Sequence, residues 1–339
     1  MSEPFEKPIG IINYYLRPNK QVERKIILEI FQSVTQSLRG SEDYRYVGMG
    51  SFYFFDFILI HKFLKIGDLV SIEDKGDINR FKFNLPYDFI TFHHLPSTRY
   101  LAETHDWAKK SIIWLDYTQG LSENRELSPD IELIGKNSTK ETFLIITLNA
   151  KAPNRKRFSA RNALLDEFRI YISPEYHKER YTSQRDYHLL LQNILINKID
   201  EFCRRNNNKF IKMFSFLYRD GAPMYTLGGI FTDDSSLNAR VQGLHTFLST
   251  NKDHVTRINI PNLTYKEKSY LDSKIRDLGL KMNACRKEVD ELCLKDDKEK
   301  EQRLQAKLSD HLAFELKPEE LENYLQFYRY YPQYYEGII

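Results

Sequence analysis

The chain has 339 residues, 41% of them hydrophobic and 29% charged, a composition that can bury a large core and excludes a disordered chain. Its formal net charge is only +3, so binding to nucleic acid would need a local basic patch. The three cysteines (Cys203, Cys285 and Cys293) form no C-x-x-C pair, and no run of about 18 apolar residues occurs, which predicts a cytoplasmic protein with no metal site and no membrane span.

The first predicted element is an N-terminal helix over residues 19–38. Apolar residues recur there at helical spacing, and Gly40 ends the segment. Lys20 and Arg24 stand four residues apart and therefore share one face of this helix. Two interpretations of this pair are open: a solvated basic face of the helix, or a pair that binds an anionic group.

Five β-rich runs follow, separated by helical or loop segments. They are apolar on both faces, a pattern typical of buried parallel strands. Their alternation with helices predicts a doubly wound α/β sheet. The runs cover residues 44–49, 68–73, 88–94, 111–117 and 142–149.

The sheet is predicted to finish in an unusual way. Residues 187–206 have the pattern of a helix, and residues 210–233 that of two long strands joined at Asp220-Gly221, which is a hairpin signal. A parallel sheet that ends in a helix and an antiparallel hairpin differs from the usual dehydrogenase sheet.

Beyond residue 250 the pattern becomes helical. A heptad seam over residues 264–294 predicts helices that dock on the domain or on a second subunit, and a homodimer is expected. The expected organisation is a helical lead or lid at 1–40, a Rossmann-like domain at 41–250 and a helical region at 251–339. The seam residues are Leu271, Ile275, Leu278, Met282, Cys285, Val289 and Leu292.

The stretch "YVGMGSFYFF" has the outline of a nucleotide-binding turn. Gly48 and Gly50 follow a strand and precede a helix, where backbone can approach a ligand and unpaired N–H groups are available. Glu73 ends the next strand, 23 residues after Gly50, near the distance of about 20 residues at which an acid binds ribose hydroxyls. A tight turn with a solvated glutamate is the alternative interpretation.

The third glycine of a dinucleotide site is missing. Residues 52–55 are Phe-Tyr-Phe-Phe, which indicates a ligand without a pyrophosphate. S-adenosylmethionine has a ribose and an adenine but no phosphate, so it fits. The terminal hairpin agrees, because the class I methyltransferase sheet ends in that way.

The chain resembles the putative O-methyltransferase family of bacteria, a divergent class I set often met in mobile or defence-type loci. The matching segments, from about residue 12 to 332, are "INYYLRPNKQVERK", "YVGMGSFYFFDF", "VSIE", "IIWLDYTQGL", "INIPNLTYKEK" and "YLQFYRYYP". The resemblance implies that Gly48, Gly50 and Ser51 border the methionine part of S-adenosylmethionine and that Glu73 binds its ribose.

The resemblance also implies that Asp116 and Tyr117 stand at the active edge of the fourth strand. Asp116 would act as general base or hold the acceptor, and Tyr117 would stack on a planar substrate or on adenine. A helix cap or turn residue is the alternative for Asp116. His93 would pack near adenine, unless the His93-His94 pair is only a turn.

Under the same resemblance the N-terminal helix would cover the cofactor pocket. Lys20 and Arg24 would then recognise an anionic group of the substrate.

Some residues depart from methyltransferase patterns. Tyr46 stands where an acid is common two residues before the first glycine, which puts the contact to the methionine amino group in doubt. The fourth strand ends in Leu-Asp-Tyr-Thr, not Asp-Pro-Pro-Tyr, and no Pro-Cys pair follows a strand. Both features disfavour the known DNA methyltransferase chemistries.

Three functions are therefore carried forward. The first is an S-adenosylmethionine-dependent methyltransferase, directed to oxygen, with an unknown acceptor. The second is a degenerate methyltransferase fold that binds a nucleotide or a partner protein, in a defence or mobile-element setting. The third is nucleic-acid binding through the basic loop at 151–161, although such loops are usually only solvated.

Overall fold

The structure is a computed structural model that describes most of the chain. The start of the N-terminal lead, the centre of the basic 151–161 loop, Cys293 and the end of the aromatic tail lie outside the described residues. No helix in the described part is both long and apolar enough to cross a membrane. The described ranges are 17–38, 40, 43–153, 158–204, 208–234, 236–292 and 296–332.

The described chain divides into two compact units. The first runs over Glu23–Arg257, and the second contains residues 17–22 and 258–332. The division at residues 40 and 250 expected from the sequence stays a prediction.

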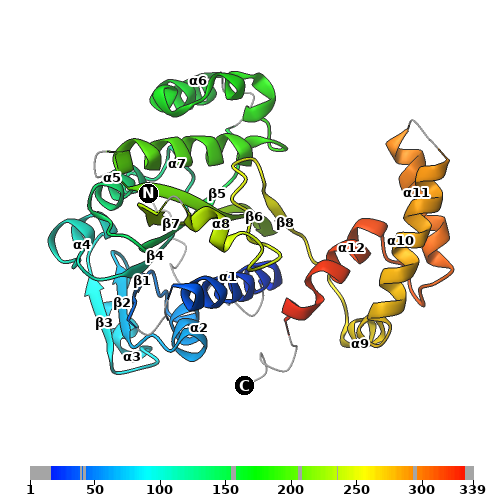
Figure 1. Ribbon diagram of the computed structural model, residues 1–339, viewed down its shortest axis with the longest axis horizontal. Coiled ribbons are helices and arrows are strands. Elements are labelled where there is room, and N and C mark those ends of the chain that lie inside the picture. Colours follow the sequence, from blue (N-terminus) through cyan, green and yellow to red (C-terminus); the bar gives the residue numbers. More distant parts are fainter. Residues whose placement is uncertain are drawn as a thin grey trace, which may run out of the picture. The chain divides into compact units, whose positions relative to one another are not determined.

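Eight strands of the described chain form one sheet in the order β3-β2-β1-β4-β5-β7-β6-β8 (Figure 1). The strands from β3 to β5 are parallel, and β7 is antiparallel to both β5 and β6. This confirms the predicted Rossmann-like sheet with its antiparallel hairpin. The strands are β1 (Arg45–Gly48), β2 (Asp68–Glu73), β3 (Ile90–His94), β4 (Ser111–Asp116), β5 (Phe143–Asn149), β6 (Lys209–Asp220), β7 (Ala222–Thr232) and β8 (Thr256–Ile258).

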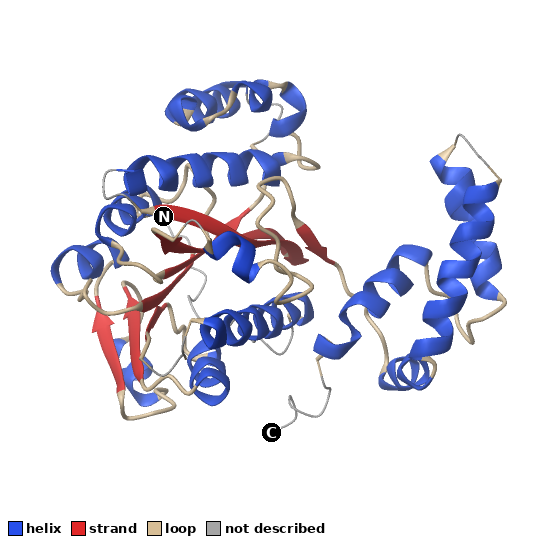
Figure 2. Cartoon of the chain, viewed as in Figure 1, coloured by secondary structure: helices blue, strands red, loops and turns tan. Residues whose placement is uncertain are grey.

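Helices cover both faces of the sheet (Figure 2). Those on one face are α4, α5 and α7, and those on the other include α1 and α2 (Figure 1). The helices of the first unit are α1 (Pro18–Ser37), α2 (Phe55–Leu64), α3 (Ile78–Phe83), α4 (Ser97–Glu103), α5 (Leu127–Asn137), α6 (Phe158–Glu167), α7 (Tyr187–Cys203) and α8 (Leu237–Val241). The first turn of α1 belongs to the second unit.

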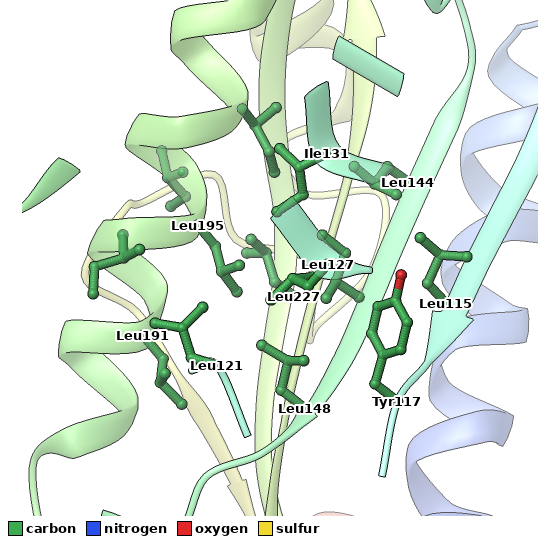
Figure 3. Packing of buried hydrophobic residues seen from close by; sticks show 14 of the residues in the cluster. Leu115, Tyr117, Leu121, Leu127, Ile131, Leu144, Leu148, Leu191, Leu195 and Leu227 are labelled. Carbon is green, nitrogen blue, oxygen red and sulfur yellow. The ribbon is translucent and has the colours of Figure 1, made fainter. Parts of the chain in front are cut away.

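A large apolar core lies between the sheet and the α5–α7 face (Figure 3). Leu115 of β4 and Leu144 of β5 meet Ile131 of α5 and Leu195 of α7 there, all at most 1% exposed. Because both sheet faces are buried, the strands need apolar residues on both sides, which is the pattern that the sequence carries.

The opposite face is packed with aromatic rings. Phe31 of α1 meets Phe143 of β5 edge-on, with 5.0 Å between ring centroids, and Tyr46 of β1 meets Phe57 of α2 at the same distance. Such edge-to-face pairs stabilise a core beyond the area that they bury. Some of the many aromatic residues of this chain therefore belong to its core.

The second unit is a small helical module made of α9 (Tyr265–Ser273), α10 (Ile275–Glu291), α11 (Asp297–Ser309) and α12 (Pro318–Phe327). The predicted heptad seam is not one helix, because the chain breaks at Lys274 (φ −118°, ψ 13°) between α9 and α10. Most seam residues are buried and α10 packs on α11 and α12, but Leu292 is 47% exposed. The seam is thus covered within its own unit, and the homodimer stays a prediction.

Candidate functional site

The turn between β1 and α2 has backbone conformations that residues other than glycine rarely adopt. Ser51 (φ 50°) and Phe54 (φ 47°) are left-handed, and α2 begins directly afterwards. A Cβ at Gly50 would lie 2.5 Å from Cδ1 of Phe54 and 2.9 Å from Oγ of Ser71, so this position requires glycine. Phe54 is fully buried behind the turn. The aromatic run that replaces the third glycine thus packs partly into the core.

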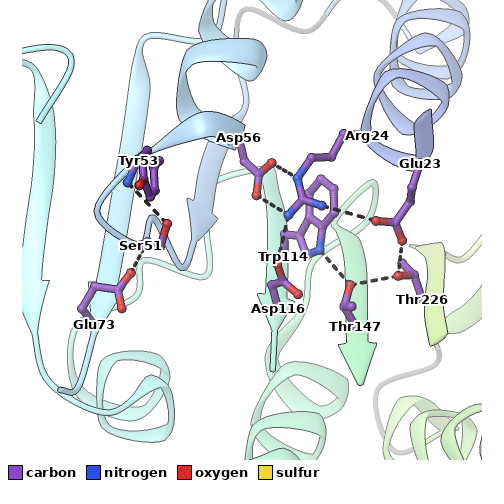
Figure 4. A network of polar contacts seen from close by, with 10 residues as sticks. All are labelled: Glu23, Arg24, Ser51, Tyr53, Asp56, Glu73, Trp114, Asp116, Thr147 and Thr226. Carbon is purple, nitrogen blue, oxygen red and sulfur yellow. Dashed lines mark hydrogen bonds and ion pairs between the residues drawn. The ribbon is translucent and has the colours of Figure 1, made fainter. Parts of the chain in front are cut away.

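Glu73 lies against this turn, at the end of β2. The backbone N–H of Ser51 donates a hydrogen bond to Oε1 of Glu73 at 2.7 Å (Figure 4). Burial raises the pKa of Glu73 to about 7, although the amide of Ser51 acts in the opposite direction. The glycine turn and Glu73, which the sequence predicts to act together, are therefore in direct contact.

Alternation along β4 sends its last residues to opposite faces. Leu115 and Tyr117 point into the core of Figure 3, whereas Trp114 and Asp116 point to the α1 side, as Figure 4 shows. Asp116 is 10% exposed and its Oδ2 accepts a hydrogen bond from Nη2 of Arg24 at 3.0 Å. Asp116 is therefore fixed by an ion pair at the carboxyl end of a buried strand, where ligands bind in open α/β sheets.

Arg24 is the centre of a buried set of charges, here called the arginine network: Glu23, Arg24, Asp56 and Asp116. Nη2 of Arg24 donates a hydrogen bond to the carboxylate of Asp56 at 2.9 Å, and Nε donates a second one to the same carboxylate. Nη1 lies 3.4 Å from Oε2 of Glu23. The guanidinium also lies over the ring of Trp114, 5.1 Å from its centroid. Arg24 is 1% exposed, so these contacts replace water around its charge.

The network continues across the sheet through neutral donors. The hydroxyl of Thr226 on β7 donates to Oε1 of Glu23, and Thr226 lies 3.0 Å from the hydroxyl of Thr147 on β5. Nε1 of Trp114 donates to Thr147 at 3.2 Å. Helix α1, strand β4 and the antiparallel strand β7 are thus tied by one continuous polar chain (Figure 4).

The other site residues predicted from the sequence lie apart from this network. The hydroxyl of Tyr117 donates a hydrogen bond to Oδ2 of Asp130 on α5. The ring of His93 lies 5.1 Å from that of Tyr100 on α4, and burial, with the charge of Arg45, lowers the pKa of His93. The cofactor role of His93 and the catalytic role of Tyr117 stay predictions.

Lys20 is buried in the first turn of α1, which belongs to the second unit, and Arg24 is also buried. Neither residue forms a solvated basic face. A role of Lys20 toward substrate stays a prediction.

Two residues of the arginine network were not expected. Asp56 is the second residue of α2 and stands alone as an acid in the apolar run "FDFILI", which is a signal that the sequence offers. Glu23 similarly stands within the apolar pattern of α1. The described residues include no group of three or more His, Cys, Asp or Glu side chains arranged to hold a metal ion.

The strand order, with β7 antiparallel between β5 and β6, is that of the class I methyltransferase fold. The sequence matches the family described as "Putative O-methyltransferase" over residues 12–339, and the chain belongs to that family. No curated protein matches it.

Several solved structures are similar in fold. Trm1 of Pyrococcus horikoshii with S-adenosyl-L-methionine has 12% identity and a TM-score of 0.45 over 66% of this chain, which spans 58% of the Trm1 chain. The tRNA methyltransferase TrmK of B. subtilis has 10% identity and a TM-score of 0.34, over 87% of this chain and 97% of that one. TYW2 of M. jannaschii with AdoMet has 12% identity and a TM-score of 0.33, over 60% and 76% of the two chains.

Proposed function

We propose that this chain is an S-adenosylmethionine-dependent methyltransferase that acts on oxygen. The observation that carries the proposal is the contact between the Ser51 amide and Glu73, beside a glycine where a Cβ has no room. Gly48, Gly50 and Ser51 would border the methionine part of the cofactor, and Glu73 would accept hydrogen bonds from its ribose.

The chemistry assigned to the chain follows from Asp116. The cofactor supplies a methyl group on a positively charged sulfur, and an acceptor hydroxyl that attacks it must lose its proton. Asp116 lies at the carboxyl end of β4 and is the most exposed acid of the arginine network. Its ion pair with Arg24 favours the ionised carboxylate. Asp116 would take that proton or hold the acceptor in line.

Calorimetry tests the cofactor assignment without knowledge of the acceptor. S-adenosylmethionine, S-adenosylhomocysteine, NAD and ATP are titrated side by side into the full chain. The first two should bind. Glu73→Ala should weaken their binding by roughly 10- to 100-fold, the range for losing a hydrogen bond to a charged group.

Gly50→Val should abolish binding by crowding the turn. Gly67→Val is its matched control, because a Cβ at Gly67 meets nothing within 4 Å. Wild-type protein that fails to bind S-adenosylmethionine at millimolar concentration would contradict the proposed function.

One observation favours a second function. Tyr46 is 1% exposed, and a Cβ at Gly48 would lie 2.5 Å from its hydroxyl, so the tyrosine packs tightly against the first glycine of the turn. An acid is common at that position in methyltransferases. This favours a degenerate fold that binds a ligand or a partner without transferring methyl groups. Cofactor binding without any methyl incorporation would support this alternative.

A further inference from the structure

The contacts of Arg24 suggest a role other than substrate binding. Its Nη2 reaches both Oδ2 of Asp56 at 2.9 Å and Oδ2 of Asp116 at 3.0 Å. Asp56 lies in the first turn of α2, the helix that follows the glycine turn, and Asp116 ends β4 (Figure 4). One side chain of α1 thereby bridges the first turn of helix α2 and the acid at the end of β4.

We propose that Arg24 is a positioning residue, which keeps Asp116 ionised and fixed relative to helix α2. The proposal rests on the proposed function, in which Asp116 acts on the acceptor. It is an alternative to the expectation that Arg24 recognises an anionic group of the substrate, and its basis is the contact of the guanidinium with the carboxylates of Asp56 and Asp116.

The physical reason is the charge environment of Asp116. Arg24 faces it from α1, while further carboxylates approach from the same helix, from α2 and from β2, namely Glu23, Asp56 and Glu73. Neighbouring carboxylates make ionisation of Asp116 harder, and a guanidinium in contact makes it easier. Without Arg24 the proton affinity of Asp116 should therefore rise.

Geometry makes arginine specific for this role. The planar fork of the guanidinium presents donors to two carboxylates at once, whereas a lysine offers one compact charge. Arg24→Lys keeps the charge but cannot reproduce the double contact with Asp56 together with the contact to Asp116. An intermediate effect is therefore expected for lysine and a full effect for Arg24→Gln.

The first test follows the titration of Asp116 directly, in the full chain without cofactor. Aspartate labelled with carbon-13 at the carboxyl group is followed by NMR against pH, and the Asp116 resonance is identified by its loss in Asp116→Asn. Its midpoint should move to higher pH in Arg24→Lys and further in Arg24→Gln. A midpoint unchanged in both folded variants would overturn the proposal.

The matched control is Arg45→Gln. Arg45 also pairs with a carboxylate, Asp68, at 3.1 Å, but this pair lies at the amino ends of β1 and β2. Arg45→Gln should leave the titration midpoint of Asp116 unchanged. A shift of that midpoint as large as the one in Arg24→Gln would contradict a specific role for Arg24. Because Arg24→Gln leaves buried carboxylates without their guanidinium, Arg24→Lys carries the test if the glutamine variant does not fold.

A second measurement connects the contact with turnover. Methyl incorporation from labelled S-adenosylmethionine into a native cell extract is compared for wild type, Arg24→Lys, Asp116→Asn and the double variant. The effects of residues that act through one another are non-additive. Arg24→Lys alone should therefore lower methyl incorporation at least ten-fold, and in the Asp116→Asn background it should lower it little. Equal costs in both backgrounds would overturn the positioning role.

The two proposals can fail separately. Absence of incorporation by the wild type would contradict the methyltransferase function, whereas the Asp116 titration would still decide whether Arg24 controls the charge of Asp116.

Discussion

Asp116 and Tyr117 are neighbours in the chain, yet they lead into two different acid clusters on opposite faces of the sheet. Asp116 joins the arginine network, in which Arg24 balances carboxylates (Figure 4). Tyr117 joins what we call the hydroxyl cluster, made of Ser97, Thr98, Tyr117 and Asp130. Three hydroxyls donate to the Asp130 carboxylate there, and no lysine or arginine of the described residues pairs with it.

The two clusters differ in the charge state that they favour. Asp130 is fully buried, and burial raises its pKa although the hydroxyls of Ser97, Thr98 and Tyr117 act against that effect. Asp116 has a guanidinium in contact and is partly exposed. Neutral donors suit an acid that fastens helices α4 and α5 to the end of β4, whereas an ion pair at the open edge suits an acid that must stay charged. We therefore expect function to follow Asp116 and stability to follow Asp130.

The largest expected effect separates the two neighbours in turnover. Asp116→Asn keeps the size of the side chain but removes the base, so methyl incorporation should fall by roughly 10²–10⁴-fold, the range for general acid–base catalysis. Affinity for S-adenosylmethionine should stay within a few fold. Tyr117→Phe is the matched control at the next position and should keep normal turnover. Equal incorporation by wild type and Asp116→Asn would remove the catalytic role.

The next effect is on stability. Asp130→Ala leaves the hydroxyls of Thr98 and Tyr117 without their acceptor, whereas the Ser97 hydroxyl keeps Oε2 of Glu126 at 2.6 Å. A buried unsatisfied group costs about 1–3 kcal/mol, so the free energy of unfolding should fall by about 3 kcal/mol. Denaturation followed by tryptophan fluorescence measures this in the first unit, which contains both tryptophans, Trp107 and Trp114. Asp68→Ala, at partly exposed ion pairs with Arg45 and Lys109, should cost less than about 1 kcal/mol. Lost turnover with unchanged unfolding would contradict the structural role of Asp130.

The third acid, Glu73, is buried against a backbone amide, that of Ser51, and tests the effect of burial on a carboxyl group at the glycine turn. Burial raises the pKa of Glu73 from 4.5 to about 7. The folded state then holds this proton more tightly, so the stabilisation is complete below pH 4.5 and is lost as the pH rises to 7. Relative to Glu73→Gln, the free energy of unfolding of the wild type should fall by up to about 3 kcal/mol across that range. A difference that is flat or rises with pH would show that Glu73 is charged throughout.

Sequence patterns predicted the sheet more completely than the contacts made around the candidate site. The strands were predictable because burial on both faces requires apolar residues throughout, and the hairpin because Asp220-Gly221 is a turn signal. Gly50, Glu73 and Asp116 could be named as candidates because each lies at or just after a strand end, where ligands of such sheets bind. Their roles stay predictions.

The arginine network could not be predicted in the same way. Arg24 and Asp116 are 92 positions apart, and Glu23 and Thr226 are 203 positions apart, so only tertiary packing brings them together. The break at Lys274 within the heptad seam was equally hidden, because no glycine or proline marks it. Local pattern therefore identified the ends of strands but not the partners that meet there.

The smallest expected effect measures a single hydroxyl of the hydroxyl cluster. Tyr117→Phe removes one donor to Asp130 and keeps the ring, so the free energy of unfolding should fall by about 1 kcal/mol, the net worth of a typical hydrogen bond. Tyr44→Phe offers the opposite case in the same unit, since the buried Tyr44 hydroxyl has no hydrogen-bond partner among the described residues. Its removal should be neutral or slightly stabilising, because a buried polar group without a partner is unfavourable. Denaturation of both variants, followed by tryptophan fluorescence, gives the difference directly. If Tyr117→Phe proved as harmless as Tyr44→Phe, Asp130 would not depend on this donor, and Tyr117 would be free to take the role toward substrate or adenine that its position beside Asp116 first suggested.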